Sequence, residues 1–216
     1  KTTFLFDGKE RDGLILEYYI PSKAQGNITI KSNVGAIGEY AFYGCDGIEN
    51  VVANELEFVD VGAFCNSSIK SFSAKGNYMI CDYAFKNCKE LETISLENAE
   101  YIGVGSFENC TSLETVTFSP SLDCISELAF SNTGLKNIVI AGNDCCIYES
   151  AFKDCKALET VKLEEGVYYL GTNAFLGCSE LKTVYISKTV KDFEENALNG
   201  CDNVTFQVTE STEGHK

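Results

Sequence analysis

Cysteine is the residue with the clearest capacity for chemistry in this sequence, because its eleven thiols could form disulfides, ligate a metal or act as nucleophiles. Six of the thiols recur in one phrase, of which Y-A-F-K-N-C over residues 83–88 is an example. They stand three residues after a phenylalanine or its replacement, at Cys45, Cys88, Cys110, Cys155, Cys178 and Cys201. Two further copies of the phrase carry Ser67 and Thr133 at this position. Because a hydroxyl can replace the thiol, the column predicts small structural side chains that donate hydrogen bonds.

Metal and nucleophilic chemistry need partners that the sequence does not supply. A zinc site needs four converging ligands, commonly in C-x-x-C pairs, and the sequence contains no such pair. A cysteine nucleophile usually needs a histidine base, and the single histidine is His215, near the end of the sequence. We therefore expect no catalytic residue, no metal site and no cofactor.

Two of the remaining cysteines form a separate case. Cys124 and Cys146 each lie six residues before the phenylalanine of consecutive copies of the phrase. If the copies stack, the two Cα atoms come within the range that a disulfide tolerates, so either a bridge or a free pair is possible. Cys65 and Cys81 share no position in the phrase, and we expect them to be unpaired.

The phrase belongs to a repeat of 21–23 residues that would position all these side chains. Its anchors are Phe42, Phe64, Phe85, Phe107, Phe130, Phe152, Phe175 and Leu198. In seven units an L-x-x-φ-x-φ stretch follows, in which φ is apolar, and its alternation predicts a β-strand. The A-F-x-x-C stretch predicts a helical turn or 3₁₀ segment, and the stretch before it predicts a second short extended segment. Repeats of this length and pattern are typical of a leucine-rich-repeat solenoid.

The predicted fold is an α/β leucine-rich-repeat solenoid, a right-handed superhelix of about eight units with a parallel concave β-sheet. The solenoid is expected over residues 34–204. Residues 1–33 are expected to form an N-terminal β cap with strands over residues 14–20 and 27–30, which would protect the end of the sheet. Residues 205–216 are expected to complete a final strand and form a polar tail.

The repeat resembles the BspA-type leucine-rich repeat of bacterial surface proteins. The resemblance covers about residues 34–204 and rests on the string I-G-x-x-A-F-x-x-C-x-x-L-x-x-V, which stands here as Ile37-Gly38-Glu-Tyr-Ala41-Phe42-Tyr-Gly-Cys45-Asp-Gly-Ile48-Glu-Asn-Val51. The family's proline after the strand survives only at Pro120. The resemblance implies adhesion, with host matrix or plasma proteins such as fibronectin or fibrinogen as partners.

Composition excludes several other classes of function. The formal net charge of −15 repels phosphate backbones, so nucleic-acid binding is not expected. No apolar run is long enough to span a bilayer, so we expect no membrane insertion by this chain, and we expect it to be a monomer. Acidic residues three positions before the anchors, such as Glu127 and Glu149, skip units and lack a calcium-binding loop motif, which favours a solvated face.

The concave sheet is the predicted binding surface, since solenoids usually bind partners there. Its candidate residues are Asn50, Val52, Thr93, Thr115, Thr117, Asn137, Val139, Thr160, Lys162, Thr183 and Tyr185. Beside them a charged column runs Glu49, Lys70, Glu92, Glu114, Lys136, Glu159 and Lys182, and predicts ion pairs that set the strand register. An alternative surface is an aromatic stripe that either faces outward or fills the core, formed by Phe58, Tyr78, Met79, Tyr101, Tyr168 and Tyr169.

These observations favour a non-enzymatic protein-recognition or adhesion module at an extracellular or bacterial cell-surface location. The alternative is a structural spacer that displays other domains and has no ligand of its own. A glycosidase with paired carboxylates is a third class, but no unit breaks the repeat to build a pocket for it.

Overall fold

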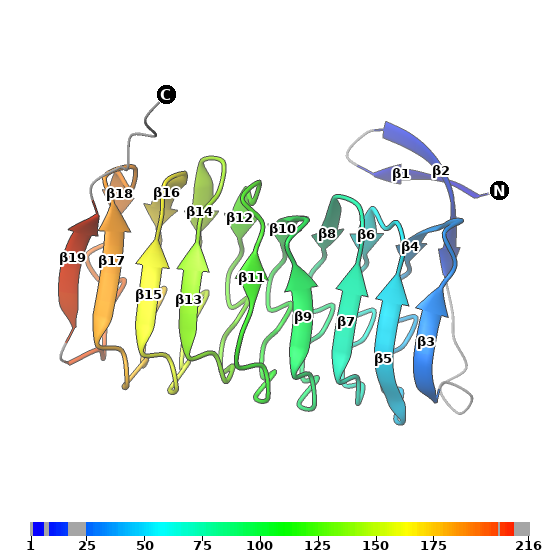
Figure 1. The fold of residues 1–216 in the computed structure, drawn as a ribbon, viewed down its shortest axis with the longest axis horizontal. Coiled ribbons are helices and arrows are strands. Elements are labelled where there is room, and N and C mark those ends of the chain that lie inside the picture. The colour runs from blue at the N-terminus through cyan, green and yellow to red at the C-terminus, as the bar shows by residue number, and fades with distance from the viewer. Residues whose placement is uncertain (1, 7–8, 17–24, 203, 210–216) are drawn as a thin grey trace.

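The computed structural model describes residues 2–6, 9–16, 25–202 and 204–209, and side chains from residue 25 onward. The chain winds into a solenoid of stacked coils, and most coils contribute one strand to each of two parallel layers (Figure 1). The predicted repeat solenoid with parallel strands is confirmed.

One layer is a ten-stranded sheet made by the second extended segment of each unit. Its order follows the chain: β1 (Thr2–Phe6), β2 (Lys9–Leu16), β4 (Val34–Ile37), β6 (Phe58–Val59), β8 (Tyr78–Ile80), β10 (Ala99–Ile102), β12 (Cys124–Ile125), β14 (Cys145–Ile147), β16 (Val167–Leu170) and β18 (Asp192–Phe193). Only β1 and β2 pair antiparallel. Every other neighbouring pair is parallel, so equivalent residues of successive coils stand side by side.

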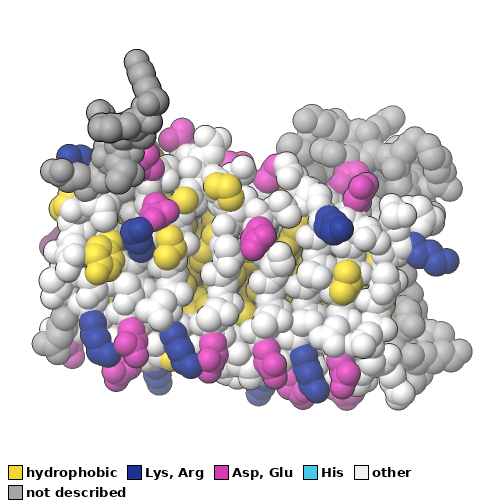
Figure 2. Space-filling model, viewed as in Figure 1, with side chains coloured by type: hydrophobic (Ala, Val, Ile, Leu, Met, Phe, Trp, Pro, Cys, Tyr) yellow, Lys and Arg dark blue, Asp and Glu magenta, His cyan; other side chains and the backbone are white. Residues whose placement is uncertain are grey.

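The other layer is made by the L-x-x-φ-x-φ strands and is divided into two sheets, which we call the front sheets because they face the viewer in Figure 1. The first contains β3 (Gly26–Ile30), β5 (Ile48–Ala53), β7 (Ser71–Ala74), β9 (Thr93–Leu96) and β11 (Thr117–Phe118). The second contains β13 (Asn137–Ile140), β15 (Thr160–Leu163), β17 (Thr183–Ser187) and β19 (Thr205–Thr209). The ladder is interrupted between β11 and β13, and Figure 2 shows a hollow with apolar side chains over this gap.

The core between the two layers is a continuous stack of phenylalanine rings. Each anchor from Phe42 to Phe175 is completely buried, and successive rings lie nearly parallel with centroids 4.8–5.3 Å apart. Burial of such a side chain contributes about 1.5–3 kcal/mol relative to exposure. The aliphatic columns Ile37 to Leu170 and Ile48 to Leu181 pack against the rings and close the core.

The A-F-x-x-C segments form turns, and no described residue is helical, so the expected helical or 3₁₀ turns are wrong. The reason is visible around Phe42, where successive backbone N–H groups donate alternately to the next coil and to their own coil. The N–H of Phe42 donates to the carbonyl of Ala63 in the next coil, at 2.6 Å, whereas the N–H of Cys45 donates back to Phe42, at 3.2 Å. A helix would need consecutive donors to bond within the same coil.

Left-handed backbone conformations on both sides of each phenylalanine anchor enforce this alternation. Tyr40 and Gly44 flank Phe42 with φ of 54° and 61°. The position two residues after the anchor has positive φ in all eight units, and its residues are Gly44, Asn66, Asn87, Asn109, Asn132, Asp154, Gly177 and Gly200. Glycine and asparagine tolerate this conformation best. This restricted composition is the signal in the sequence that identifies the segment as a turn.

The N-terminal strands lie beside the first repeat. β2 joins β4 and β3 joins β5, both in parallel, so residues before 34 extend both layers. β2 begins five residues before the expected strand at residue 14, and residues 17–20 of that expected strand lie outside the described residues. β1 was not expected from the sequence. At the other end β19 pairs with β17, and the expected polar tail over 210–216 lies outside the described residues.

Candidate functional site

The cysteine column lies inside the solenoid and links successive coils. Five of its six thiols donate to the carbonyl oxygen of the preceding unit's anchor phenylalanine. The Sγ–O distances are 3.0 Å for Cys88 to Phe64, and 3.1–3.2 Å for Cys110, Cys155, Cys178 and Cys201 to their own partners. Thr133 fills the same column and donates its hydroxyl to Phe130 over 3.0 Å. The Thr133 hydroxyl thus bonds to the anchor of its own unit, whereas the thiols bond to the anchor of the preceding unit.

Burial suppresses the reactivity of Cys88 and Cys110, whereas at Cys155 the effect of burial is outweighed by hydrogen bonds with Cys178 and Thr133, which lower its pKa. Cys88 and Cys110 are completely buried, and burial raises the pKa of Cys88 to about 12 and that of Cys110 well above its ordinary value. The thiolate is the nucleophile and the metal ligand, so thiols held protonated in the core suit neither role. All eleven cysteines are unbridged.

Cys124 and Cys146 are register partners on the parallel strands β12 and β14. Both thiols are partly buried and free, and burial raises both pKa values. The Cys124 thiol lies 3.4 Å from the Ser126 hydroxyl, and the Cys146 thiol donates to the Asp144 carbonyl over 3.7 Å. The structure thus brings the two residues of the predicted pair together in the reduced state.

The predicted binding residues lie on the outer face of the front sheets, where register places them in two columns. One column contains Asn50, Thr93, Thr115, Asn137, Thr160 and Thr183, and the other contains Val52, Thr117, Val139, Lys162 and Tyr185. Val52 and Val139 are 44% and 50% exposed, whereas Tyr185 and Lys162 are half-buried. Figure 2 shows that this face is mainly uncharged and polar, with isolated apolar side chains. It is a long regular surface that could contact a partner along several coils.

The predicted charged column forms along one edge of this face. Lys70 lies 3.6 Å from Glu49, and the corresponding pairs Lys136–Glu114 and Lys182–Glu159 are 2.5 Å and 3.1 Å apart. Alternating positive and negative side chains are visible along the lower edge in Figure 2. Because these pairs are exposed to solvent, each contributes at most about 1 kcal/mol, in agreement with a role in register and solubility.

The aromatic stripe does not form one surface. Phe58 and Tyr78 are 5% and 1% exposed and belong to the core, and the Tyr78 hydroxyl donates to the carbonyl of Ser95. Met79, Tyr101 and Tyr169 are half-buried, and only Tyr168 is 36% exposed. Core packing therefore applies to Phe58 and Tyr78. Partial exposure applies to the tyrosines of the later coils, Tyr101, Tyr168 and Tyr169.

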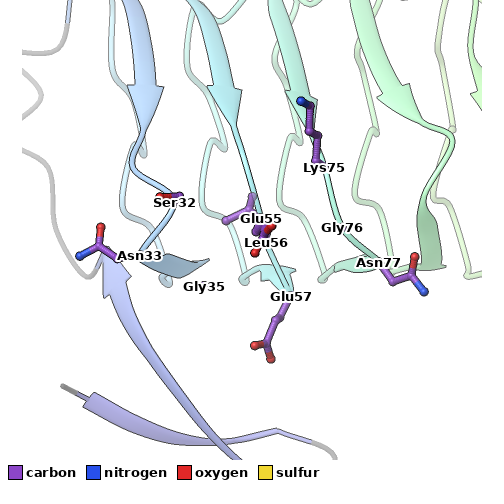
Figure 3. A pocket seen from close by; sticks show the side chains of 9 residues that line it. All are labelled: Ser32, Asn33, Gly35, Glu55, Leu56, Glu57, Lys75, Gly76 and Asn77. Atoms are coloured by element: carbon purple, nitrogen blue, oxygen red, sulfur yellow. The ribbon is translucent and has the colours of Figure 1, made fainter.

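Surface pockets lie at the edges of the layers. One of about 400 Å³ is formed by turns around Leu56 and Gly76, and Figure 3 shows Asn33, Glu57 and Asn77 pointing in different directions from it. A second, of about 510 Å³, is polar and lies by Glu92 and Thr115. Neither pocket brings side chains together in a catalytic arrangement, and the described residues contain no group of three potential metal ligands.

A third pocket, of about 440 Å³, was not anticipated from the sequence. Tyr101 and Tyr148 line it together with Glu127 and Glu149, and Cys124 and Ser126 are also among its lining residues. Ser126 donates its hydroxyl to that of Tyr101 over 3.1 Å. The acidic column, which was expected to be a solvated face, therefore supplies two carboxylates to an aromatic pocket. The proximity of Tyr148 could have been inferred only from the turn geometry, because Tyr148 lies outside the aromatic column.

A ladder of asparagine side chains was also missed. Asn87 donates its side-chain amide to Asn66 over 2.9 Å, and Asn109 and Asn132 continue the ladder, each over 2.8 Å. These asparagines have positive φ and follow the anchors of four consecutive units. Their recurrence two residues after the anchor was the available signal.

No helix long and apolar enough to cross a membrane occurs among the described residues. No curated protein sequence matches the chain. Solved structures with a similar arrangement include a leucine-rich cell surface protein from Faecalibacterium prausnitzii A2-165, with 17% identity over 97% of this chain and 86% of that one, at a TM-score of 0.49. Leucine-rich repeat proteins from Bacteroides ovatus and Treponema pallidum are 18% and 20% identical. They cover 96% and 95% of this chain and 90% and 82% of their own, with TM-scores of 0.39 and 0.44.

The family comparison covers most of the chain. The model of the BspA type leucine rich repeat region, which holds six copies, matches residues 17–99 and 78–205. These matches include every anchor, the cysteine column and all the strands of the front sheets except β19, of which they include only Thr205. The chain belongs to the BspA type leucine-rich-repeat family.

Proposed function

We propose that this chain is a non-enzymatic protein-recognition module of a bacterial surface or secreted protein, and that its front sheets bind an extracellular protein. The observation that carries the proposal is the outer face of these sheets. Side chains at equivalent positions stand in register over successive coils, and no other described element covers them. Such a face offers a partner a broad contact area, as solenoid proteins commonly do.

The chemistry of the remaining side chains supports a binding role over an enzymatic one. The thiols of the column are buried and used in hydrogen bonds between coils. The surface location is supported by membership in a family of bacterial surface proteins. The family resemblance makes fibronectin and fibrinogen the first partners to test.

A binding screen tests the proposal. The chain is immobilised and exposed to a panel of purified extracellular matrix and plasma proteins at physiological salt, with an unrelated protein of equal negative charge as the control. We expect saturable binding of at least one panel protein that the acidic control does not show. A chain that binds none of them would be the structural spacer, and the recognition proposal would be abandoned.

A further inference from the structure

The third pocket has the composition of a site for a positively charged group. Tyr148 is 46% exposed, and Tyr101, which also lines the pocket, is half-buried. Glu127 and Glu149 occupy equivalent turn positions in successive coils and are both exposed. Aromatic faces attract cations, and carboxylates strengthen that attraction where water is partly excluded.

The same protein shows how such a group of side chains binds a cation. One turn of the solenoid holds the ammonium of Lys86 between a tyrosine and a glutamate. The Lys86 Nζ lies 5.0 Å from the ring centroid of Tyr83 and 2.8 Å from the carboxylate of Glu108, which belongs to the next coil. A lysine of the chain itself therefore forms a cation–π contact with a tyrosine and an ion pair with a glutamate of the adjacent coil.

The third pocket contains the same kinds of side chain, tyrosine and glutamate, but no cationic residue among those that line it. No lysine or arginine lines it, and neither Glu127 nor Glu149 forms an ion pair with a described residue. It offers two tyrosines and two carboxylates, whereas Lys86 has one of each. Its volume of about 440 Å³ is sufficient for the end of a long side chain.

We propose that the pocket formed by Tyr101, Tyr148, Glu127 and Glu149 binds a lysine or arginine side chain of a partner protein. The net charge of −15 would draw basic segments toward the chain and increase their rate of encounter. This site lies at the carboxyl ends of β10, β12 and β14 in the ten-stranded sheet and extends the proposed function to a second surface. Its test requires no partner for the front sheets, so the two proposals can fail separately.

The binding is measured by nuclear magnetic resonance titration of the isotope-labelled chain with blocked single residues, N-acetyl-arginine methylamide and N-acetyl-lysine methylamide. We expect chemical-shift changes that centre on residues 101, 126, 127, 148 and 149. Blocked glutamine serves as the neutral control and should leave these signals unchanged. Comparison of the two basic probes shows whether guanidinium or ammonium is preferred.

Paired variants separate the site from the general negative charge of the chain. Glu127→Gln with Glu149→Gln removes both carboxylates and should weaken binding at least ten-fold. Glu39→Gln with Glu195→Gln removes the same charge from equivalent exposed turn positions of other coils and should change the affinity less than two-fold. Tyr148→Phe should retain binding, and Tyr148→Ser should lose it.

Two outcomes would overturn the proposal. Equal weakening by the two glutamine pairs would show that only the overall charge attracts the probe. Shifts at these residues with calcium chloride, but not with either basic probe, would identify a divalent-cation site in place of a basic side-chain site.

Discussion

The thiol of Cys88 donates a hydrogen bond to the backbone carbonyl oxygen of Phe64, one coil earlier, over 3.0 Å. That carbonyl also accepts from the backbone N–H of Ser67 over 3.0 Å, so the thiol supplies its second hydrogen bond. The same thiol lies 3.5 Å from the hydroxyl of Ser67, its neighbour in the column. Cysteine in this repeat thus acts as a hydrogen-bonding link between coils.

The buried thiols predict a loss of stability at alkaline pH. Burial raises the pKa of Cys88 to about 12, from 9.0 for an exposed thiol. Its contribution is therefore fully present below pH 9 and is lost as pH rises from 9 toward 12, because the unfolded chain ionises first. Each such thiol lowers the free energy of unfolding by up to about 1.4 kcal/mol per pH unit in this window.

Urea unfolding of the wild type and of Cys88→Ser, which cannot ionise, measures this contribution between pH 8 and pH 11. The variant should lose less stability than the wild type above pH 9, and the two should show parallel behaviour below it. An identical pH dependence of both proteins would contradict the assignment of a buried, protonated thiol.

Ser106 predicts a stabilising substitution. It is the only exception to alanine immediately before the anchors, and its hydroxyl is completely buried without a hydrogen-bond partner among the described residues. Ser106→Ala should raise the free energy of unfolding by about 1–2 kcal/mol, because it removes an unsatisfied polar group. Ala84→Ser, in the preceding coil, should lower it by a similar amount. Chemical denaturation of both variants checks the prediction, which fails if Ser106→Ala is destabilising.

Asn87 separates backbone conformation from side-chain hydrogen bonding. Its φ is 61°, and its side chain lies in the middle of the asparagine ladder. Asn87→Ala should cost about 1–2 kcal/mol, since alanine is strained in the left-handed region and makes no ladder contact. Asn87→Gly removes only the ladder and should cost less than the alanine variant. If denaturation shows equal losses in the two variants, the ladder and not the left-handed backbone is the dominant contribution.

Oxidation distinguishes the two classes of cysteine. Cys124 and Cys146 are partly exposed register partners, whereas the column thiols lie in the core. With a small-molecule disulfide oxidant, peptide mapping of the native chain should find Cys124 linked to Cys146 while Cys88 and Cys110 stay reduced. A peptide that links Cys88 to Cys110 would show that the column is accessible and would refute its structural role.

The solenoid could be predicted because its core repeats at fixed intervals, and the phenylalanine and leucine columns require coils that stack. The turn conformation was missed because a short A-F-x-x-C stretch also suits a helical turn. The evidence against a helix is the glycine, asparagine or aspartate two residues after each anchor, which adopts positive φ.

The third pocket depends on contacts that the column pattern does not contain. Tyr101 belongs to the aromatic column and Tyr148 does not, and they line the same pocket only because the turn after β14 directs residues 148 and 149 toward it. Register predicts which residues stand side by side on strands. It does not predict how the residues between strands converge.

The central claim is that recognition occurs on the front sheets, and paired surface variants test it most directly. Val139→Lys with Tyr185→Ser alters the face without changing a completely buried residue, and Tyr43→Ser alters a tyrosine that is 48% exposed in the turn after Phe42. The measurement is the dissociation constant of each variant for the protein bound in the panel. We predict at least a ten-fold increase for the front-sheet variant, less than a two-fold change for Tyr43→Ser, and unchanged thermal unfolding for both. Equal affinity of the wild type and the front-sheet variant would place recognition elsewhere on the molecule and contradict the claim.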